Sequence, residues 1–457
     1  MSIHVTRPSV DRLPRAMRTG AEMIASRLKT CGYQAWIVGG AVRDLALNSR
    51  PTDIDMATDA HPEVIESLFA HTTLVGKAFG TIIVHVNVPD RAVPGAGGVD
   101  PNSEGQDIDV ELTTFRSEGA YKDGRHPDEV TYGSSAEEDA RRRDFTCNAL
   151  YLDPSSDEFL DPEQGLADLE AGRLRCVGEP SARFAEDGLR LLRLARLTAR
   201  LGLDPDEDTL AGARTSRGAL EGVSAERVLA ELRGIFAAPQ PVQAFHLMRD
   251  LGILEGALPG ISSLAPEGSD QGQRLAMRLG ALAELKGPVE FVTGLALLLD
   301  PDPFGEGAGA AVDTVRGRAE RLLVRLHPSR ELRRGVLGSW DLAARVRAIL
   351  GGEARRSERL LLIRDVLWHP TFLRLRAWAC AGGLDWGDSL EALARERASL
   401  SQGELFPRPL LSSEDLAAAA IERGPRWGEL LLEAEALQLD GVLQSPEQAR
   451  RWLADLS

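Results

Sequence analysis

The sequence predicts a mixed α/β N-terminal part followed by a helical remainder. Up to about residue 160, short apolar runs with strand spacing alternate with helical segments, and the clearest of these runs are residues 81–88 and 106–115. Beyond Asp161 the apolar residues recur at helical spacing, as in Arg183–Arg200. The length of 457 residues gives room for two to four domains with ample core.

In chain order, the first expected element is a helix over Asp11–Thr30, which leads into a strand ending at Val38. A short helix over Pro62–Ala70 and the two strands named above follow. The stretch between those strands, residues 89–105, is rich in glycine, proline and acids and predicts a hairpin insertion. Residues 115–127 are polar and broken by glycine, which predicts a loop.

Composition and charge narrow the class of protein. A formal net charge of −16 argues against general affinity for nucleic acid, so an RNA partner would have to be met by a local basic patch. No apolar run is long enough to span a bilayer, and the N-terminus has no signal-peptide core. The four cysteines are scattered and read as free thiols rather than a disulfide framework or zinc site, so we expect a cytoplasmic protein.

A glycine turn and a pair of aspartates follow the first strand. Gly39 and Gly40 lack side chains, so backbone N–H groups there could approach a phosphate chain closely, with Arg43 on the next helical turn. Asp53 and Asp55 are two residues apart in an extended segment and therefore point to the same face.

Two such carboxylates suit Mg²⁺, which also takes oxygens from substrate phosphates. The combination predicts a metal-dependent nucleotidyl-transfer site. The alternative is an ordinary strand–helix turn followed by a surface Asp-x-Asp.

A third carboxylate is expected from the strand at 106–115. Asp107, Asp109 and Glu111 alternate onto one face of it. Glu111 is our choice as the third catalytic carboxylate because it lies nearest the TTFR segment that follows. A charged, solvent-facing strand edge would have the same pattern.

Arginines suited to phosphate binding occur in two later segments. Arg116, Lys122 and Arg125 lie in the predicted loop and could reach incoming phosphates. Arg143 follows Arg142 and precedes an aspartate where a helix leaves the sheet, and a planar guanidinium suits a triphosphate or a sugar hydroxyl. Structural salt bridges are the competing explanation.

The segment Arg183–Arg200 is expected to be a helix carrying Asp187, Arg190, Arg193 and Arg196 at intervals of three residues. Asp187 and Arg190 together could read a base, because a carboxylate accepts from an exocyclic amine while a guanidinium donates to the adjacent ring nitrogen. Cytosine and adenine satisfy that pair, whereas uracil and guanine would leave polar groups unpaired. A salt-bridged solvent face is the alternative.

The chain resembles the class II tRNA nucleotidyltransferase and bacterial poly(A) polymerase family, which includes the CCA-adding enzymes. Five motifs carry the resemblance, in family order: GGAVRD at Gly39–Asp44, DID at Asp53–Asp55, TTFR and YKDGRHP within Thr113–Pro127, RRDFTCNAL at Arg142–Leu150 and EDGLRLLRLAR at Glu186–Arg196. The resemblance implies that Asp53 and Asp55 hold metal and that the nucleotide contacts are Gly40, Arg43, Arg143, Asp187, Arg190, Arg193 and Arg196. Many relatives have proline where this chain has Gly188, which should loosen the start of that helix.

The resemblance also implies an architecture and partners. We expect a nucleotidyltransferase-type α/β head over residues 1–160, a helical neck with the nucleotide-template helix over 161–235, and a helical body and tail over 236–457 that binds tRNA. The arginine-rich stretches Arg316–Arg334 and Arg345–Arg364 could contact phosphate backbone, or be solvated faces. The implied partners are the tRNA 3′ acceptor end, ATP, CTP and Mg²⁺, in a monomer or homodimer away from membranes.

Four functions remain open at this point. The first is untemplated addition of the 3′-terminal CCA to tRNA. The second is partial addition, of the terminal A alone or of CC alone; the loop at 115–127 counts against CC-only activity, because CC-only relatives lack a functional loop there. The third is poly(A) polymerase. The segment Leu74–Val86 counts against it, because this segment resembles the tRNA enzymes more than the polymerases. The last is a non-catalytic RNA-binding protein.

Overall fold

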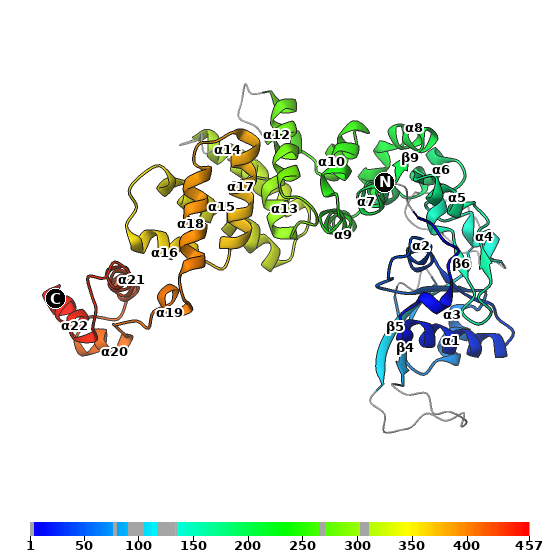
Figure 1. Cartoon of the computed structure of the whole chain (residues 1–457), viewed down its shortest axis with the longest axis horizontal. Coiled ribbons are helices and arrows are strands. Elements are labelled where there is room, and N and C mark those ends of the chain that lie inside the picture. The colour runs from blue at the N-terminus through cyan, green and yellow to red at the C-terminus, as the bar shows by residue number, and fades with distance from the viewer. Residues whose placement is uncertain are drawn as a thin grey trace. The chain divides into compact units, whose positions relative to one another are not determined.

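The computed structural model describes residues 4–75, 80–89, 105–116, 133, 135–264, 270–301 and 310–456. The chain divides into two compact units, one built from Met1–Ile235 and Gln243–Ala257 and the other from Phe236–Val242 and Leu258–Ser457. Figure 1 shows strands and helices together in the first unit and helices along the described part of the second. The predicted α/β head followed by a mostly helical remainder is therefore confirmed.

The head is built on a mixed sheet of seven strands in the order β3-β4-β5-β2-β1-β6-β7. Strands β2 and β5 pair in parallel, and the other neighbouring pairs in this sheet are antiparallel. The strands are β1 (Ala35–Val38), β2 (Asp55–Thr58), β3 (Thr72–Leu74), β4 (Thr81–Val88), β5 (Gln106–Thr114), β6 (Tyr151–Leu152) and β7 (Phe159–Leu160). The strands predicted at 81–88 and 106–115 are present, and the hairpin insertion predicted between them lies almost entirely outside the described residues.

One row of paired residues crosses the sheet and organises the site. Glu111 on β5 pairs with Asp55 on β2, Asp55 pairs with Val38 on β1, and Val38 pairs with Tyr151 on β6. Residues paired across strands project to the same face of a sheet. The row therefore places two carboxylates, one apolar side chain and one phenol on a common face.

The opposite face is covered by α1 (Arg15–Thr30), which contacts β1, β4 and β5. A Cβ at Gly20 of this helix would lie 2.1 Å from the side chain of Ile108, so the glycine allows the helix to approach β5 closely. The predicted helix over Asp11–Thr30 is interrupted at Pro14, because proline lacks an N–H group; a short turn, η1 (Val10–Arg12), precedes it.

Short helices complete the first half of the chain. They are α2 (Gly40–Ala46), α3 (Pro62–Leu68), α4 (Ala136–Ala140), η3 (Thr146–Asn148), α5 (Gly165–Glu170), α6 (Pro180–Glu186), α7 (Leu189–Leu201), α8 (Glu207–Thr215), η4 (Arg217–Gly222), α9 (Ala225–Phe236), α10 (Pro241–Asp250) and α11 (Leu254–Ala257). Two two-residue strands, β8 (Arg173–Leu174) and β9 (Asp204–Pro205), pair within the segment expected to be helical.

The prediction of one continuous helix over Arg183–Arg200 is wrong at Asp187. The helix α6 ends at Glu186, Asp187 is extended with φ −147°, and α7 begins at Leu189. A Cβ at Gly188 would lie 2.2 Å from the carbonyl oxygen of Ala219 in η4, so this glycine lets the η4 backbone approach the start of α7. The sequence predicted only that Gly188 loosens the start of the helix, and it did not predict this close backbone contact.

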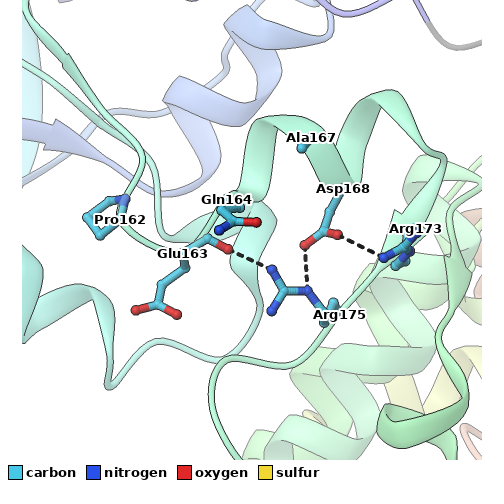
Figure 2. A pocket seen from close by; sticks show the side chains of 7 residues that line it. All are labelled: Pro162, Glu163, Gln164, Ala167, Asp168, Arg173 and Arg175. Atoms are coloured by element: carbon cyan, nitrogen blue, oxygen red, sulfur yellow. Dashed lines mark hydrogen bonds and ion pairs between the residues drawn. The ribbon is translucent and has the colours of Figure 1, made fainter.

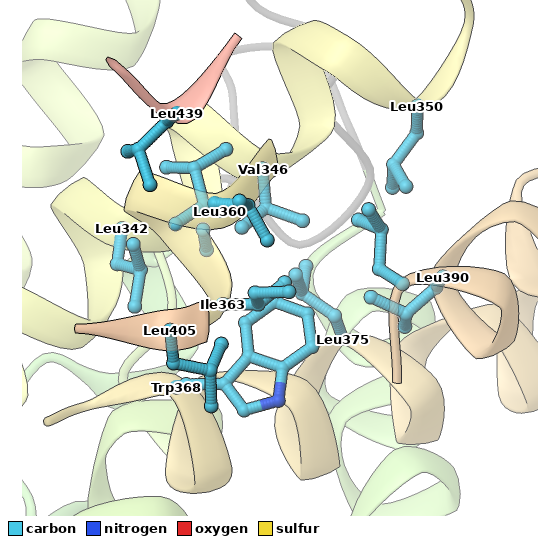
Figure 3. Packing of buried hydrophobic residues seen from close by; sticks show 13 residues of the cluster. Leu342, Val346, Leu350, Leu360, Ile363, Trp368, Leu375, Leu390, Leu405 and Leu439 are labelled. Atoms are coloured by element: carbon cyan, nitrogen blue, oxygen red, sulfur yellow. The ribbon is translucent and has the colours of Figure 1, made fainter. Parts of the chain in front are cut away.

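The second unit is helical throughout its described residues. Its elements are η5 (Ile261–Ser263), α12 (Gln271–Glu284), α13 (Phe291–Leu298), α14 (Ala310–Arg325), α15 (Arg330–Leu350), α16 (Arg356–Ile363), α17 (Trp368–Gly382), α18 (Gly387–Ser399), α19 (Gln402–Leu405), α20 (Ser413–Ala418), α21 (Pro425–Leu439) and α22 (Pro446–Asp455). Figure 3 shows leucines of α15 to α18 packed around Trp368. None of the helices described here has the length and apolar character needed to cross a membrane.

Candidate active site

Three exposed carboxylates lie together on the face of the sheet opposite α1. Asp55 is the first residue of β2 and sits beside Glu111 of β5, while Asp53 precedes it by two residues. The other two acids of the β5 face are bonded to β4: Asp109 pairs with His85 at 2.6 Å, and Asp107 accepts from Asn87 at 2.6 Å. Glu111 is therefore the β5 acid that lies against the aspartates, as chosen from the sequence.

The carboxylates form a centre of uncompensated negative charge. Although Asp55 keeps an exposed surface, its partial removal from water, together with repulsion from Glu111 and Asp53, raises its pKa to about 6. Arg143 and Arg193 act in the opposite direction without cancelling the effect. Among the described residues, no group of three or more His, Cys, Asp or Glu side chains is already arranged to hold a metal ion. The excess charge and the oxygen donors nevertheless fit a hard divalent cation.

The turn between β1 and α2 is built on Gly39, which has φ 70° and ψ −127°. Side chains other than hydrogen are disfavoured in this conformation. A Cβ there would also lie 3.2 Å from Nη1 of Arg143. The turn thus places the backbone of Gly39 next to the guanidinium of Arg143, beside the cross-strand row that contains Asp55.

Gly39→Ala is expected to lower the free energy of unfolding by about 1–3 kcal/mol through backbone strain, and to weaken nucleotide binding through displacement of Arg143. The matched control is Gly32→Ala, since Gly32 has φ 86° but an added methyl group there would meet no atom of the described residues within 4 Å. Chemical denaturation and nucleotide titration of both variants would check this. If both variants bind nucleotide equally well, the turn has no part in binding.

Arg43 is enclosed by structural partners. It is 3% exposed, and its guanidinium donates to Asp44 at 2.7 Å and to the side-chain oxygen of Asn148 at 2.6 Å. Asp44 also accepts from Arg200 of α7 at 3.0 Å. The predicted role of Arg43 as a nucleotide contact stays a prediction, whereas its place in a network joining α2, η3 and α7 is plain.

Arg143 lies between the glycine turn and β6. Its Nε and Nη2 donate to one carboxylate oxygen of Asp139, at 3.1 and 2.9 Å, and its Nε also donates to the hydroxyl of Tyr151 at 2.9 Å. Burial alone would lower the pKa of Arg143, but Tyr151 and Asp139 raise it above its ordinary value. Arg143 is therefore a fixed positive charge.

Arg193 connects α7 to the motif that contains Asp144, and Arg196 connects α7 to α9. Arg193 donates to Asp144 at 2.6 Å, and Arg196 donates to Glu231 of α9 at 2.6 Å. Burial disfavours the ionised form of Asp144, but Arg193, together with hydrogen bonds from Asn148 and the Phe145 N–H group, holds its pKa well below the usual range. These arginines therefore form ion pairs with other parts of the protein rather than a solvent-exposed face of α7.

The predicted base-reading pair lies at the break between α6 and α7. Asp187 accepts from the Leu189 N–H group at 3.0 Å and from Arg227 of α9 at 2.7 Å. Arg190 donates to Glu186 at 2.7 Å and to the carbonyl oxygen of Arg142 at 3.1 Å. The two side chains are held by separate partners. For both to bind the same base, their hydrogen bonds to these partners would have to rearrange.

Several residues of these networks were missed by the sequence analysis: Asp44, Asp139, Asn148, Tyr151, Arg227 and Glu231. Asp44 and Asn148 lie inside matched motifs, which was a usable signal. The i,i+4 spacing of Asp139 and Arg143 was a further local signal. Tyr151 gave none, because its position beside them depends on the pairing of β6 with β1. Arg116 is described and approaches Thr81 at 3.5 Å, while Lys122 and Arg125 lie outside the described residues.

A separate pocket of about 340 Å³ lies beside α5 and contains none of the predicted site residues. Figure 2 shows Arg175 donating to Asp168 and to the carbonyl oxygen of Glu163, with Arg173 on the other side of Asp168. Two acids, Asp168 and Glu163, and two arginines, Arg173 and Arg175, line the pocket, so their formal charges balance.

Comparison with known proteins places this site in a family. Residues 35–175 match the family described as the poly A polymerase head domain, and residues 202–264 match the family described as "Probable RNA and SrmB- binding site of polymerase A". The CCA-adding enzyme of Streptococcus gordonii is 31% identical over 429 residues, covering 93% of this chain and 94% of that protein. That of Enterococcus faecalis is 39% identical over 219 residues, covering 48% and 49% respectively.

Solved structures agree on the fold. The Bacillus stearothermophilus CCA-adding enzyme, solved with CTP, aligns with a TM-score of 0.70 at 24% identity, covering 97% of this chain and 98% of that one. The Thermotoga maritima CCA-adding enzyme, solved with tRNA, aligns with a TM-score of 0.64 at 18% identity, covering 98% and 97%. With near full-length similarity in both sequence and fold, this chain belongs to the family of class II tRNA nucleotidyltransferases and bacterial poly(A) polymerases that includes the CCA-adding enzymes.

Proposed function

We propose that this chain adds the 3′-terminal CCA to tRNA from CTP and ATP without a nucleic-acid template. The observation that carries the proposal is the pairing of Asp55 with Glu111 beside the Gly39 turn, in a chain whose full length is similar to a CCA-adding enzyme. The enzyme is a nucleotidyltransferase. The 3′-hydroxyl oxygen of the RNA forms a bond to the α-phosphorus of the nucleotide and gives up its proton, while the bond between the α- and β-phosphates breaks and pyrophosphate leaves.

Asp53 and Asp55 would hold the metal ion, with Glu111 as the third catalytic carboxylate. Enzymes of this family generally depend on a metal, and we propose Mg²⁺ because the donors are carboxylate oxygens. When bound, the ion supplies positive charge that polarises the transferring phosphate. Asp55 is poised for such a partner, because the repulsion that raises its pKa would be relieved by a cation.

The remaining predicted residues would bind the nucleotide. The backbone of Gly39 and Gly40 approaches the triphosphate, and Arg143 lies over the same turn. Arg43 would contact the nucleotide from α2, and Arg193 and Arg196 from α7, where ion pairs with Asp144 and Glu231 hold the two side chains. Asp187 and Arg190 read cytosine or adenine by their amino group and adjacent ring nitrogen.

We propose the functional division given by the sequence: a catalytic head over 1–160, a neck with the template residues over 161–235, and a tRNA-binding body and tail over 236–457. Exposed arginines in the body support the last assignment. Five of them, with the exposed Glu331 among them, lie at the end of α14 and the start of α15: Arg321, Arg325, Arg330, Arg333 and Arg334. Such arginines can contact phosphate backbone although the net charge of the chain is −16. We also propose a cytoplasmic monomer or homodimer, in keeping with four free cysteines.

The test is addition to three tRNA transcripts, ending at the discriminator base, after the first C and after the second C. Each is incubated with Mg²⁺ and with CTP, ATP or both. We expect all three to be completed to CCA and then to stop, because a growing 3′ end changes what fits against a fixed protein template.

Each other outcome assigns a different function. Completion of only the transcript that already ends in CC would make the protein an A-adding enzyme, and a stop after CC would make it the complementary one. Long adenosine tails on unrelated RNA would identify a poly(A) polymerase. Tight tRNA binding without any incorporation would leave a non-catalytic RNA-binding protein.

A further inference from the structure

Two buried side chains outside the sequence-predicted set, Asp139 and Tyr151, meet the predicted residue Arg143 at the edge of the site. A single carboxylate oxygen of Asp139 accepts from Nε and Nη2 of Arg143 and from the hydroxyl of Tyr151, the last at 2.8 Å. Tyr151 has no exposed surface, and Asp139 is 8% exposed. The guanidinium carbon of Arg143 lies 5.1 Å from the centre of the Tyr151 ring. Arg143 is therefore held by one charge, one hydroxyl and one aromatic face.

The fold fixes where this arrangement sits. Tyr151 belongs to the cross-strand row that contains Val38, Asp55 and Glu111. Neighbouring strands lie about 4.8 Å apart, so Tyr151 is two strands, or roughly 10 Å, from Asp55. Asp139 comes from α4, whose residues Ala136 and Ala140 pack in the same core as Tyr151 and Val38. The position of Arg143 is thus set by the sheet itself.

Some N–H groups of Arg143 bond to neighbouring residues, and the others are left for a ligand. A guanidinium has five N–H groups. In the part of the chain that the structure describes, Nε serves Asp139 and Tyr151, one N–H of Nη2 serves Asp139, and one N–H of Nη1 approaches the carbonyl oxygen of Asn148 at 3.4 Å. One N–H remains on each Nη atom, and Nη1 is the atom beside Gly39. The side chain is 23% exposed, which leaves this outer edge open to a ligand.

We propose that Tyr151 and Asp139 are positioning residues that lock the outer edge of Arg143 at the Gly39 turn, where it receives the phosphates of the incoming nucleotide. This inference rests on the proposed function, which makes Arg143 a nucleotide contact. Pre-orientation matters because an arginine side chain that is free to rotate loses rotamer entropy when a ligand fixes it. Tyr151 and Asp139 fix it before the nucleotide arrives.

The test is Tyr151→Phe, which keeps the ring and its packing but removes the hydroxyl between Arg143 and Asp139. A hydrogen bond to a charged group contributes about 1.5–3 kcal/mol, so we expect roughly a tenfold or greater rise in KM for CTP and ATP alike. We expect kcat and the KM for tRNA to change little. Nucleotide affinity without tRNA, measured by equilibrium titration, should weaken by the same factor. Tyr33→Phe, which removes the hydroxyl of a half-buried tyrosine elsewhere in the head, is the matched control.

Arg143→Gln separates this inference from the proposed function. If Arg143→Gln leaves nucleotide affinity unchanged, Arg143 is not a nucleotide contact and the proposed function of that residue fails. If Arg143→Gln weakens affinity but Tyr151→Phe and Asp139→Asn do not, the positioning role is overturned. The double variant Tyr151→Phe/Arg143→Gln should be no weaker than Arg143→Gln alone, because Tyr151 acts through Arg143. Additive losses would indicate an independent, structural effect instead.

Discussion

Asp55→Asn is expected to reduce nucleotide incorporation by about 10³-fold or more, while the fold and tRNA affinity are retained. The change keeps the shape of the side chain but removes the charge that we propose pairs with the metal, at the centre of the Asp53–Asp55–Glu111 group. Single-turnover incorporation and a tRNA binding assay would measure the two effects. Asp107→Asn is the control, because Asp107 lies on the same face of β5 but is bonded to Asn87. Comparable turnover by the Asp55 variant would remove this residue from the mechanism.

The same variant is expected to be more stable than the wild type at pH 7 in metal-free buffer. The folded-state pKa of Asp55 is raised from 3.8 to about 6, so the folded protein favours the neutral carboxyl and is destabilised by its ionisation. That destabilisation is complete above about pH 6 and disappears below about pH 4. The Tm advantage of Asp55→Asn should therefore be present at pH 7 and vanish as the pH falls through this window. An unchanged Tm difference across the window would show that crowding of the carboxylates is not the cause.

Asp187→Asn is expected to relax the choice of base. The carboxylate can only accept hydrogen bonds, and this excludes a uracil or guanine carbonyl; the amide of asparagine can also donate to such a carbonyl. Sites that leave a buried polar group unpaired reject the wrong ligand by up to about 10⁴-fold. The variant should incorporate UTP or GTP at least tenfold better relative to CTP and ATP, as measured by competition between nucleotides.

The asparagine variant is preferable to alanine because its side-chain oxygen can still accept from the Leu189 N–H group at the start of α7. Glu207→Gln, on an exposed residue at the start of α8, controls for the loss of a negative charge nearby in the chain. Retention of wild-type discrimination by Asp187→Asn would mean that the base is read elsewhere. A loss of CTP and ATP use without any gain for UTP would assign Asp187 to the structure of the α6–α7 break.

The networks around the site show what local patterns can and cannot reveal. Strand alternation predicted that Asp53 and Asp55 share a face, but only Asp55 lies on β2, and Asp53 is in the bend that precedes it. Glu111 followed from the same local rule applied to the next long strand. By contrast, the extended conformation of Asp187 depends on the η4 backbone, which approaches Gly188 from about thirty residues away in the chain and leaves no room for a Cβ. The spacing of apolar residues along a helix cannot predict this contact between η4 and Gly188.

The sequence by itself determined the class of the fold, the glycine turn, the carboxylate pair and the family, because these depend on residue type and on spacing along a single strand or turn. The tertiary structure decided that Glu111 lies against Asp55, since only the parallel pairing of β2 with β5 fixes that register. It also decided that Tyr151 and Asp139 hold Arg143, and that α9 supplies Arg227 and Glu231 to the residues around α7. Apart from the i,i+4 pair of Asp139 and Arg143, those contacts join residues 8 to 56 positions apart. Their formation depends on burial and backbone pairing between separate segments rather than on a local pattern.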